Sequence, residues 1–597
     1  MVFASESAFS GDFGGRLMPG GPPTFAKKTQ VTGNVRIGAL HHGLFVCEHR
    51  DVPYFGPMDV NAQQKPLDVL VIGGGINGVG IARDAVGRGY SVLLCERDDF
   101  AAHTSSASTK LVHGGLRYLE QYEFKLVRES LTERERLLRA APHIIWPMRF
   151  ILPHHKGLRP AWLLRLGLFV YDHLGGRKML PPTKRRRFAE ARGPANDESQ
   201  PVTGAFLDKA FTFGFEYSDC WVEDSRLVVL NALDAEGRGA QMRSRTACKA
   251  LERQDGLWRV LLEDSDGNKQ WVLARSVVNA AGPWVDDILR RQGGSTPNAA
   301  ARNASNLRLV KGSHIVTKRL YDGDEAFIFQ HTDGRIAFAI PYENDFTLIG
   351  TTDLAFNGDA ASVEIDQEEI SYLCDLVNTY LHKSISADDV VWSYSGVRPL
   401  FDDQQDNASV VTRDYVFDMS SEELGAPLLS IFGGKITTYR KMAEHAVDRL
   451  IDRLPSTGAG RAPSAPWTEE KTLPGGDIPD ADFDGFFAAQ KKRYPGFEPR
   501  LIRRLARAYG TRMGLILGDH QNEAQLGEAF GAGLTQAECA YLVTHEFAAT
   551  AEDILWRRSK LGLHMTADEI KSFSSWFEQA YPSRIKSPSL STTKFGT

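Results

Sequence analysis

The stretch Leu67-Asp68-Val69-Leu70-Val71-Ile72-Gly73-Gly74-Gly75-Ile76-Asn77-Gly78 decides the fold of this chain. An apolar run of strand length ends at Gly73, and the spacing Gly73-x-Gly75-x-x-Gly78 then opens a helix. Gly73 allows a tight turn, Gly75 lets the backbone approach a pyrophosphate, and Gly78 lets the helix pack closely on the strand. A second apolar run ends in Glu96, where a carboxylate can bind a ribose hydroxyl. A purely structural glycine turn is the alternative, but strand, helix and acid together predict a dinucleotide-binding unit.

The composition is that of an ordinary globular protein and argues against several classes of function. The chain has 597 residues, enough for about two or three domains. Its net charge of -5 argues against a dedicated nucleic-acid-binding protein, so no nucleic acid is expected as a partner. The six cysteines form no C-x-x-C pair, which predicts a reducing compartment and neither a disulfide framework nor a metal site of the zinc type.

The two ends of the chain differ from its centre. Residues 1–65 are rich in Gly and Pro without sustained periodicity, which predicts a disordered N-terminal extension, with a transit peptide as the alternative. Residues 454–475 are rich in Pro, Gly, Ser and Ala and predict a linker. Residues 476–597 have helical periodicity and a capping box at Thr566-x-x-Glu569, which predicts a C-terminal α-helical domain. No apolar run reaches about twenty residues, so no membrane-spanning segment is expected.

Three strand ends that carry glycine lie far apart in the sequence, at Gly73, Gly282 and Gly433-Gly434. An NAD-dependent enzyme usually needs only the first, whereas a flavin dinucleotide is bound along its whole length, so FAD is the expected cofactor. The helix start after Gly434 can direct N–H groups at the pyrimidine end of the flavin ring. Residues 308–353 alternate apolar and polar side chains, which predicts antiparallel strands.

These patterns predict an α/β fold, with a Rossmann-like FAD-binding domain, an interleaved antiparallel-sheet substrate (cap) domain and a C-terminal helical domain. The oxidoreductase domain is expected over residues 66–453. Its flavin-binding parts are expected at about 66–300 and 390–453, and its cap part at about 301–389.

A series of motifs resembles the aerobic, FAD-dependent glycerol-3-phosphate dehydrogenase family, of bacterial type, within the D-amino-acid-oxidase-like superfamily. The motifs are Ile72 to Glu96, Thr104-Ser105-Ser106-Ala107-Ser108 with His113 to Leu119, Gly214-Phe215-Glu216-Tyr217-Ser218-Asp219-Cys220-Trp221, Lys311-Gly312-Ser313-His314, Gly350-Thr351-Thr352-Asp353, Ser395-Gly396-Val397-Arg398-Pro399-Leu400 and Phe432-Gly433-Gly434-Lys435. The resemblance implies oxidation of sn-glycerol 3-phosphate to dihydroxyacetone phosphate in glycerol catabolism, by hydride transfer to FAD, with electrons passed to a membrane quinone. It also implies a peripheral protein at the cytoplasmic face of the inner membrane, and makes a homodimer one candidate assembly. The extension before Pro66 departs from the shorter bacterial members, which leaves targeting open.

The resemblance also implies roles for individual residues. The expected catalytic residues are Arg398, Lys435 and His314; the expected substrate-binding residues are Arg117, Tyr118, His113 and Arg413; and the expected cofactor-binding residues are Gly73, Gly75, Gly78, Glu96, Thr104, Ser105, Ser106, Ser108, Gly282, Gly433 and Gly434. Arginine suits a phosphate because its planar fork donates two parallel hydrogen bonds. Arg398 and Lys435 are expected to stabilise the alkoxide that develops beside the flavin.

Several of these assignments have a structural alternative. The general base stays open among His314, His113 and Lys435. His113 precedes two glycines and is also suited to capping a turn, while His314 lies on a predicted strand and could be a core residue. Arg413 could equally be a surface ion-pair partner.

A basic segment from His154 to Arg192 contains ten Lys or Arg residues and only two acids. Within it, Ala161 to Tyr171 is apolar and aromatic but too short to span a bilayer, and Lys184-Arg185-Arg186-Arg187 follows. This combination predicts a helix that lies on an anionic membrane surface, near a lipid-soluble quinone. The alternative is a core helix next to a solvated basic loop.

Three other functions compete with the dehydrogenase. One is a glycerol-3-phosphate oxidase that uses O2, and another is a related flavin amine oxidase, which the several cations favour less. A flavin-bearing binding protein without turnover is the third, and the presence of Arg398 and Lys435 argues against it.

Overall fold

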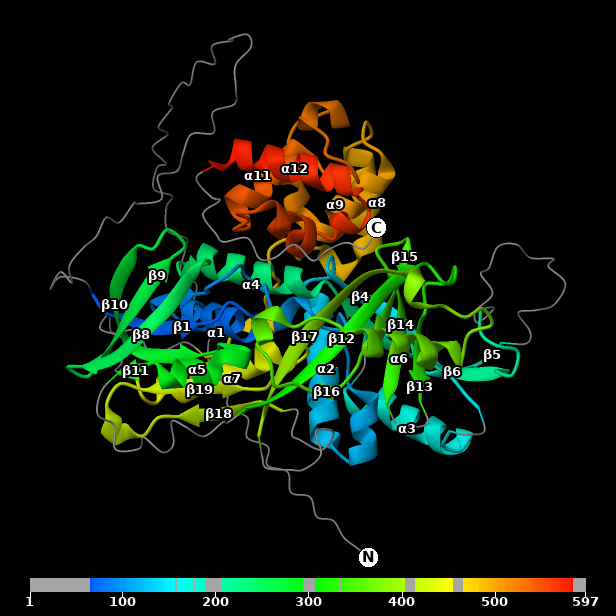
Figure 1. The fold of residues 1–597 in the computed structure, drawn as a ribbon, viewed down its shortest axis with the longest axis horizontal. Coiled ribbons are helices and arrows are strands. Elements are labelled where there is room, and N and C mark those ends of the chain that lie inside the picture. Colours follow the sequence, from blue (N-terminus) through cyan, green and yellow to red (C-terminus); the bar gives the residue numbers. More distant parts are fainter. Residues whose placement is uncertain are drawn as a thin grey trace, which may run out of the picture. The chain divides into compact units, whose positions relative to one another are not determined.

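The chain folds around two β-sheets, each covered by helices, and continues into a C-terminal group of helices (Figure 1). This computed structural model describes residues 65–155, 158–176, 178–188, 206–293, 307–331, 335–402, 414–454 and 465–582. The predicted disordered extension lies outside the described residues apart from Lys65, and so do residues 455–464 of the predicted linker. The expected α/β class is confirmed.

The first sheet contains the predicted dinucleotide unit and has nine strands in the described part of the chain. Its strands are β1 Leu67–Ile72, β2 Val92–Cys95, β7 Gln241–Arg243, β8 Thr246–Gln254, β9 Leu257–Asp264, β10 Lys269–Asn279, β11 Gln292–Gly293, β18 Val416–Met419 and β19 Leu428–Phe432. β10 pairs in parallel with both β1 and β19. The carboxyl ends of these three strands therefore meet at one edge of the sheet, which brings the three glycine turns together.

The second sheet has ten strands in the described ranges. Its strands are β3 Leu111–Val112, β4 Ile145–Pro153, β5 Lys184–Arg187, β6 Phe213–Val222, β12 Leu307–Lys318, β13 Ala326–Gln330, β14 Ile336–Tyr342, β15 Phe346–Gly350, β16 Leu354–Ala355 and β17 Val390–Phe401. The antiparallel strands expected within 308–353 are present. The sheet nevertheless extends beyond the expected cap limits of 301–389, because β3 to β6 join it on one side and β17 pairs along the length of β12. Such pairing between distant segments leaves no trace in local periodicity.

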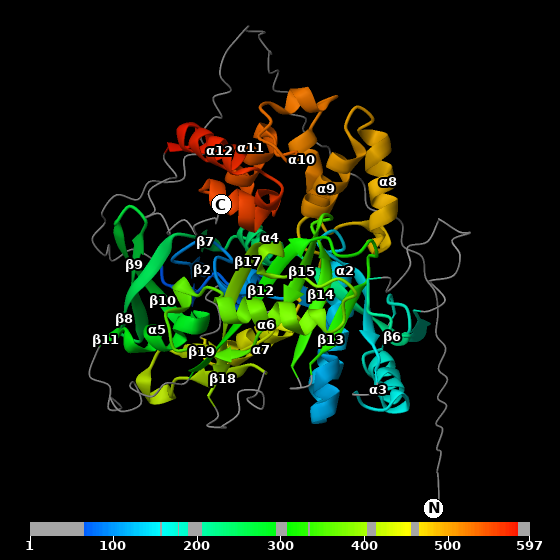
Figure 2. The same ribbon diagram turned by 45° about the vertical axis from the view of Figure 1, so that its right-hand side comes forward.

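Helices cover both sheets. In the oxidoreductase region they are α1 Ile76–Gly87, α2 Phe124–Ala140, α3 Ala161–Leu174, α4 Asp224–Gly237, α5 Val285–Arg290, α6 Gln367–Asn378 and α7 Tyr439–Ile451. The side chains of α1, α4 and α7 share one core with Val69 and Val71 of β1, while Leu70 and Ile72 face a second core beneath β8 and β9. In the second sheet, α6 packs on one face, visible in Figure 2, and α2 and α3 pack on the other.

Helix α3 corresponds to the predicted apolar helix, but it is not a core helix. Only Leu168 and Tyr171 of its described side chains are buried. Trp162 is 68% exposed and Phe169 is 59% exposed. The alternative of a helix buried in the core is therefore wrong. No helix in the described part of the chain combines the length and the apolar character needed to cross a bilayer.

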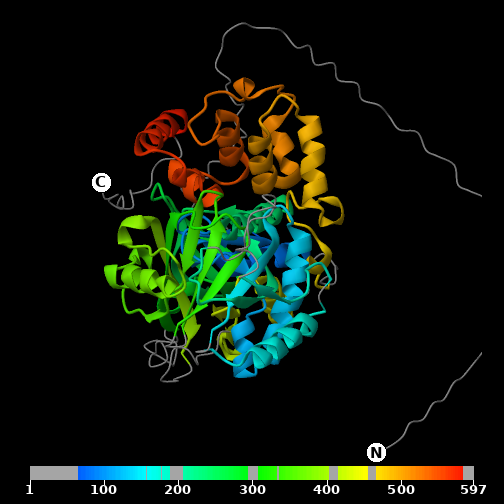
Figure 3. The ribbon, with the colours of Figure 1, turned by 90° about the vertical axis from the view of Figure 1, so that its right-hand side faces the viewer.

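The C-terminal helices form a core of their own, as predicted (Figure 3). They are α8 Phe483–Arg493, α9 Pro499–Tyr509, α10 Gly514–Leu517, α11 Gln536–His545, α12 Ala567–Ala580 and a π-helix at Asp553–Arg558. The predicted capping box at Thr566 and Glu569 starts α12. Buried ion pairs join these helices to segments that pack around the first sheet. Arg558 pairs with Asp99, in the loop after β2, at 2.6 Å, and Glu546 pairs with Arg226 of α4.

Candidate active site

The three glycine turns lie in direct contact at the carboxyl edge of the first sheet. The Asn77 side-chain amide donates to the Gly433 carbonyl at 3.1 Å and so joins the first turn to the third. A Cβ at Gly73, where φ is +114°, would lie 2.4 Å from the Ala280 carbonyl oxygen, so the first and second turns touch. At Gly78 a Cβ would lie 2.0 Å from the Gly73 oxygen, which gives the predicted close packing of helix on strand.

One cavity of about 790 Å³ connects these turns with the proposed substrate residues. Of the predicted residues it is lined by Gly73, Gly75, Glu96, Thr104, Ser105, Ser108, Gly282, Gly433, Gly434, His113, Tyr118, His314, Arg398 and Lys435. Gly78 and Ser106 are absent from its lining. Arg413 lies outside the described residues, and for Arg117 only the backbone is described, in a turn of helix at Leu116–Gln121.

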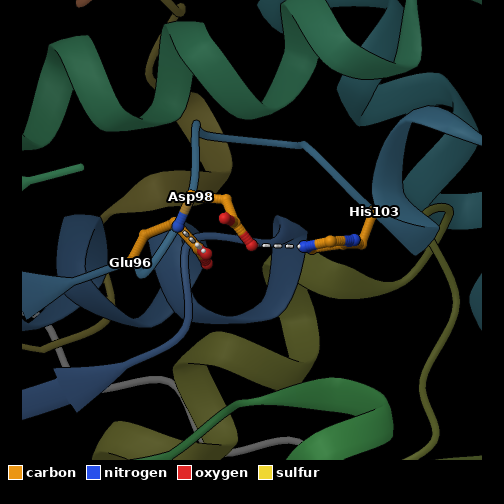
Figure 4. A group of neighbouring side chains, drawn as sticks. All are labelled: Glu96, Asp98 and His103. Carbon is orange, nitrogen blue, oxygen red and sulfur yellow. Dashed lines mark hydrogen bonds and ion pairs between the residues drawn. The ribbon is translucent and has the colours of Figure 1, made fainter. Parts of the chain in front are cut away.

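Glu96, predicted to be the ribose-binding acid, follows β2 directly and lines the cavity. Figure 4 shows it beside Asp98 and His103. Its carboxylate accepts from the Gly74 N–H at 2.6 Å and from the Asp98 N–H at 2.9 Å, and Asp98 in turn contacts His103 Nε2 at 2.7 Å. Burial raises the pKa of Glu96, and the two backbone N–H groups oppose that rise. The ligand atoms of Glu96, Asp98 and His103 lie within 4.8 Å of one another, but these hydrogen bonds account for the cluster without a metal ion.

The hydroxyl-rich loop beside the turns is held mainly by bonds within the protein. The Ser105 hydroxyl accepts from the Ile76 N–H at 3.0 Å, at the first residue of α1. Thr104 donates to the Val397 carbonyl at 2.8 Å, and Ser108 donates to Asp224 at 2.7 Å. Of these three hydroxyl groups, the described hydrogen bonds place only that of Ser105 at the start of α1. The predicted phosphate contact is therefore best supported for Ser105.

The geometry of these turns fits FAD. The N-cap residue of α1 is Gly75, which has no side chain to cover the helix start, and a Cβ there would lie 3.0 Å from Ser105 Oγ. Gly282 has φ +56° with nothing within 4 Å of a built Cβ. Glu96 would hold the adenosine ribose, the start of α1 the pyrophosphate, and Gly434 the pyrimidine end of the ring.

Arg398 enters the cavity from β17. Its Nη1 donates to Asp353 Oδ1 at 3.0 Å and its Nη2 to Thr351 Oγ1 at 3.1 Å, and its side chain stays 31% exposed. Gly312, on the neighbouring strand β12, makes this position accessible, because a Cβ there would lie 2.4 Å from Arg398 Nη2. The two motifs that contain Gly312 and Arg398 thus serve one guanidinium group.

Lys435 and His113 flank the same space. The Lys435 ammonium lies 3.9 Å from the centroid of the Tyr118 ring, a cation–π contact. His113 Nδ1 accepts from the Gly115 N–H at 3.2 Å, as the turn-capping alternative predicted. Since His113 also lines the cavity, capping does not remove it from the site.

His314 is deeply buried, with only 1% of its surface exposed, on β12. Its Nε2 lies 3.0 Å from Thr109 Oγ1, and its ring stacks on Tyr394 at 4.7 Å between centroids. Burial, followed by the charges of Arg398 and Lys110, holds the pKa of His314 well below 6.5. The imidazole is therefore neutral at pH 7, and within the described part of the chain no hydrogen-bond partner faces its Nδ1.

Known proteins resemble this chain over most of its length. The family model described as FAD dependent oxidoreductase matches residues 68–440, and one described as the C-terminal domain of alpha-glycerophosphate oxidase matches residues 466–573. The chain is 50% identical to D-erythritol 1-phosphate dehydrogenase of Brucella abortus (strain 2308), over 87% of this chain and 99% of that one. It is 47% identical to aerobic glycerol-3-phosphate dehydrogenase of Escherichia coli (strain K12), over 87% and 98%. The glycerol-3-phosphate dehydrogenase of Bacillus halodurans, solved with FAD, superposes with a TM-score of 0.64 at 28% identity, covering 87% of this chain and 91% of that one.

The chain therefore belongs to the FAD dependent oxidoreductase family, and within it to the group that includes the glycerol-3-phosphate dehydrogenases. The resemblance found in the motifs is confirmed, and so is FAD as the cofactor of an oxidoreductase.

Sequence reasoning missed several residues of this site. Thr351 and Asp353, which hold Arg398, were within a recognised motif but received no role. Asn77 was likewise quoted without a role, although its position inside the glycine motif could have indicated a contact with another turn. Tyr394 had no signal at all, because its partners come from other strands and loops.

Proposed function

We propose that this enzyme oxidises sn-glycerol 3-phosphate to dihydroxyacetone phosphate and passes the electrons to a membrane quinone. The observation that carries the proposal is a single cavity in which the flavin turns, Arg398, Lys435 and a buried neutral histidine meet. A phosphorylated alcohol needs cations for its charge and a proton acceptor for its hydroxyl, and both are present there.

When bound, FAD supplies the acceptor for the hydride that leaves carbon 2 of the substrate. Arg398 and Lys435 hold the oxygen atoms of the substrate and stabilise negative charge on the alcohol oxygen as its proton leaves. Asp353 and Thr351 fix the plane of the Arg398 guanidinium before the substrate arrives. Tyr118, which lines the cavity, orients the phosphate end of the substrate, and the same role stays a prediction for Arg117.

His314 accepts the hydroxyl proton in this proposal. A general base must be unprotonated before the reaction, and the low pKa of His314 keeps its ring neutral at pH 7. In the tautomer whose Nε2–H donates to Thr109 Oγ1, Nδ1 carries no proton and is the atom that receives one. The same low pKa favours prompt release of the proton to solvent in the cavity.

A second substrate, D-erythritol 1-phosphate, is favoured by one observation. The Brucella abortus relative named for that substrate is 50% identical, slightly more than the 47% of the Escherichia coli glycerol-3-phosphate dehydrogenase. Both substrates carry a phosphate and a secondary alcohol, so the same cations and the same base would serve either one.

An anaerobic titration tests the reaction. Glycerol 3-phosphate should bleach the flavin absorbance of the holoenzyme at a lower concentration than D-erythritol 1-phosphate does, and a quinone analogue should then restore the colour. The reverse order would assign the second substrate. Stoichiometric hydrogen peroxide on admission of air, without quinone, would favour the oxidase, and a flavin that neither compound bleaches would contradict the proposal.

The electron acceptor is proposed from the apolar part of the cavity lining. This part includes side chains of α3, such as Leu163 and Val170, together with Phe124 at the start of α2. Trp162 and Phe169 project from the same helix into solvent, and Arg159 and Arg165 are exposed beside them. This surface suits peripheral attachment to the cytoplasmic face of the inner membrane, with a lipid-soluble quinone entering along α3.

Part of the predicted basic segment serves the fold instead of the membrane. Residues 184–187 form the edge strand β5, and Lys184 and Arg186 pair with the buried carboxylate of Glu216. Arg185 lies over the Phe213 ring at 4.2 Å. The membrane proposal therefore rests on α3 and not on the four consecutive basic residues.

Flotation with vesicles that contain anionic lipid tests the attachment. Replacing both Trp162 and Phe169 by Ser should lower the fraction of protein bound by about tenfold or more, because each apolar side chain contributes roughly 1.5–3 kcal/mol when buried. Leu515→Ser is the control, since Leu515 is 58% exposed on α10 of the C-terminal domain. Equal binding by wild type and both variants would contradict the role of α3. A homodimer stays a prediction that sedimentation analysis can check.

A further inference from the structure

Tyr394 of β17 contacts the site histidine and the hydroxyl loop at the same time. Its ring stacks on His314 with centroids 4.7 Å apart and planes inclined by 15°. Its hydroxyl donates to the Ser108 carbonyl at 2.8 Å, next to Thr109, which bonds His314 Nε2. Tyr394 therefore contacts His314 in two ways: directly, by ring stacking, and indirectly, by its hydrogen bond to the loop that carries Thr109.

Tyr394 is also connected to the C-terminal domain, through two tryptophan rings. Trp392, two residues before Tyr394, contacts the Tyr394 ring at 5.2 Å between centroids. Trp556 of the π-helix Asp553–Arg558 stacks on Trp392 at 5.1 Å with planes inclined by 21°. A continuous row of aromatic rings thus runs from the C-terminal domain to His314.

The same π-helix also contacts the loop that follows Glu96, the predicted ribose-binding acid. Arg557 and Arg558 both bond to Asp99, at 2.7 Å and 2.6 Å, in the loop that follows Glu96. π-helical turns are rare and concentrate at functional sites. Here the turn places three consecutive side chains, Trp556 to Arg558, on two different parts of the oxidoreductase region.

We propose that Tyr394 is a positioning residue for His314, and that the C-terminal domain supports it through Trp392 and Trp556. The inference rests on the proposed role of His314 as the proton acceptor. The described residues give the imidazole one hydrogen bond, to Thr109, so the orientation of its ring about that bond depends on the stacked tyrosine. A misplaced base loses rate steeply with distance, by up to about a hundredfold for 1 Å.

The first test compares Tyr394→Leu with Tyr394→Phe in the holoenzyme. Single-turnover reduction of the flavin by glycerol 3-phosphate should slow roughly 10- to 100-fold in Tyr394→Leu, while the dissociation constant of the substrate changes by less than about threefold. Tyr394→Phe keeps the ring and loses only the bond to Ser108, so it should restore most of the rate. A leucine variant that reduces at the wild-type rate would overturn the proposal.

The second test separates positioning from general structural support. In a His314→Asn background, the Tyr394→Leu change should slow flavin reduction by less than about twofold, because the group it positions is already gone. If Tyr394 acts elsewhere, the two losses should multiply instead, and the proposal fails. Flavin content and the midpoint of thermal unfolding are measured for every variant to show that each holds its cofactor.

The third test addresses the C-terminal domain. Trp556→Leu should slow flavin reduction by about two- to tenfold with unchanged flavin content. Trp576→Leu is the matched control, since Trp576 contacts Phe530 and Phe573 within the C-terminal core. Equal rates for the two tryptophan variants would remove the C-terminal domain from the proposal.

A readout that needs no turnover completes the design. In protein labelled with carbon-13 at histidine Cε1, the His314 resonance, assigned through His314→Asn, should move when Tyr394 becomes Leu, because the ring current of the tyrosine is lost. It should stay in place in Trp576→Leu. A wild-type flavin that glycerol 3-phosphate does not reduce would contradict the proposed function, whereas an unmoved resonance in Tyr394→Leu would contradict only the positioning role.

Discussion

The substrate end of the cavity and the contact between the C-terminal domain and the first sheet both use arginine, but they use it differently. At the contact, Arg558 is fully buried and Asp99 receives it through two hydrogen bonds, at 2.6 and 2.8 Å. At the cavity, Arg398 keeps 31% of its side chain exposed while it donates to Asp353 at 3.0 Å and to Thr351 at 3.1 Å.

This difference separates charges that hold the structure from charges that meet a ligand. A buried pair with all its bonds inside the protein has a large effect on stability when it is broken and cannot take a new partner. A partly exposed arginine that Asp353 and Thr351 orient still lines the cavity. The predictions below break or sharpen that contrast.

The largest effect is expected for Asp99→Ala. It leaves the buried guanidinium groups of Arg557 and Arg558 without their shared carboxylate, so the free energy of unfolding should fall by about 3–5 kcal/mol, measured by urea denaturation. The control is Arg500→Ala, which removes an exposed pair with Asp345 and should change stability by about 0.5 kcal/mol or less. Similar losses in both variants would erase the contrast.

Arg398→Ala should instead leave stability nearly unchanged and reduce turnover. Loss of one group that stabilises the developing charge corresponds to about 10²–10³ in kcat, or roughly 2.7–4 kcal/mol. Steady-state kinetics measure the turnover, and the flavin absorbance of the purified variant shows whether FAD is still bound. Arg259→Ala is the control, because Arg259 has a similar exposure of 28% on β9 and pairs with Glu252. Turnover within a few fold of wild type would refute the catalytic role.

A pair of glycine variants tests the flavin end. Gly239 has φ +101° with open space around it, so Gly239→Ala should lower the free energy of unfolding by about 1–2 kcal/mol. Gly73→Ala adds a collision with the Ala280 carbonyl, so it should lose roughly 1–3 kcal/mol more and bind FAD more weakly. Equal effects on unfolding, with full FAD occupancy in both, would show that the close approach of the first two turns is unimportant.

The smallest effect concerns acid. Burial alone would raise the pKa of Asp553, but the charges of Arg557 and Arg245 outweigh it and hold that pKa well below 3.8. Because the folded pKa is the lower one, this group stabilises the protein above about pH 4 and loses that contribution as the pH falls further. Urea midpoints at pH 7, 4 and 3 should therefore fall less steeply in Asp553→Asn than in wild type. Parallel curves would contradict the buried pairing.

The sequence predicted what local patterns encode. The glycine turns, Glu96 and the strands β10, β12 and β15 follow from periodicity and turn chemistry, and Arg398 follows from a motif. The extent of the second sheet did not, because β4 pairs with β13 across more than a hundred residues that carry no matching pattern. Tyr394 and Asp99 escaped for the same reason, since their importance comes from partners on distant segments.

The bond between Asn77 and the Gly433 carbonyl spans 356 positions of the chain. One side of the cofactor pocket is therefore synthesised near the beginning of the oxidoreductase region and the opposite side close to its end. A ribosome-bound chain that has not yet emerged past Gly434 lacks the third glycine turn, so its cofactor site is incomplete. Loading with FAD must accordingly follow synthesis, so that yellow protein reports chains whose oxidoreductase region is complete.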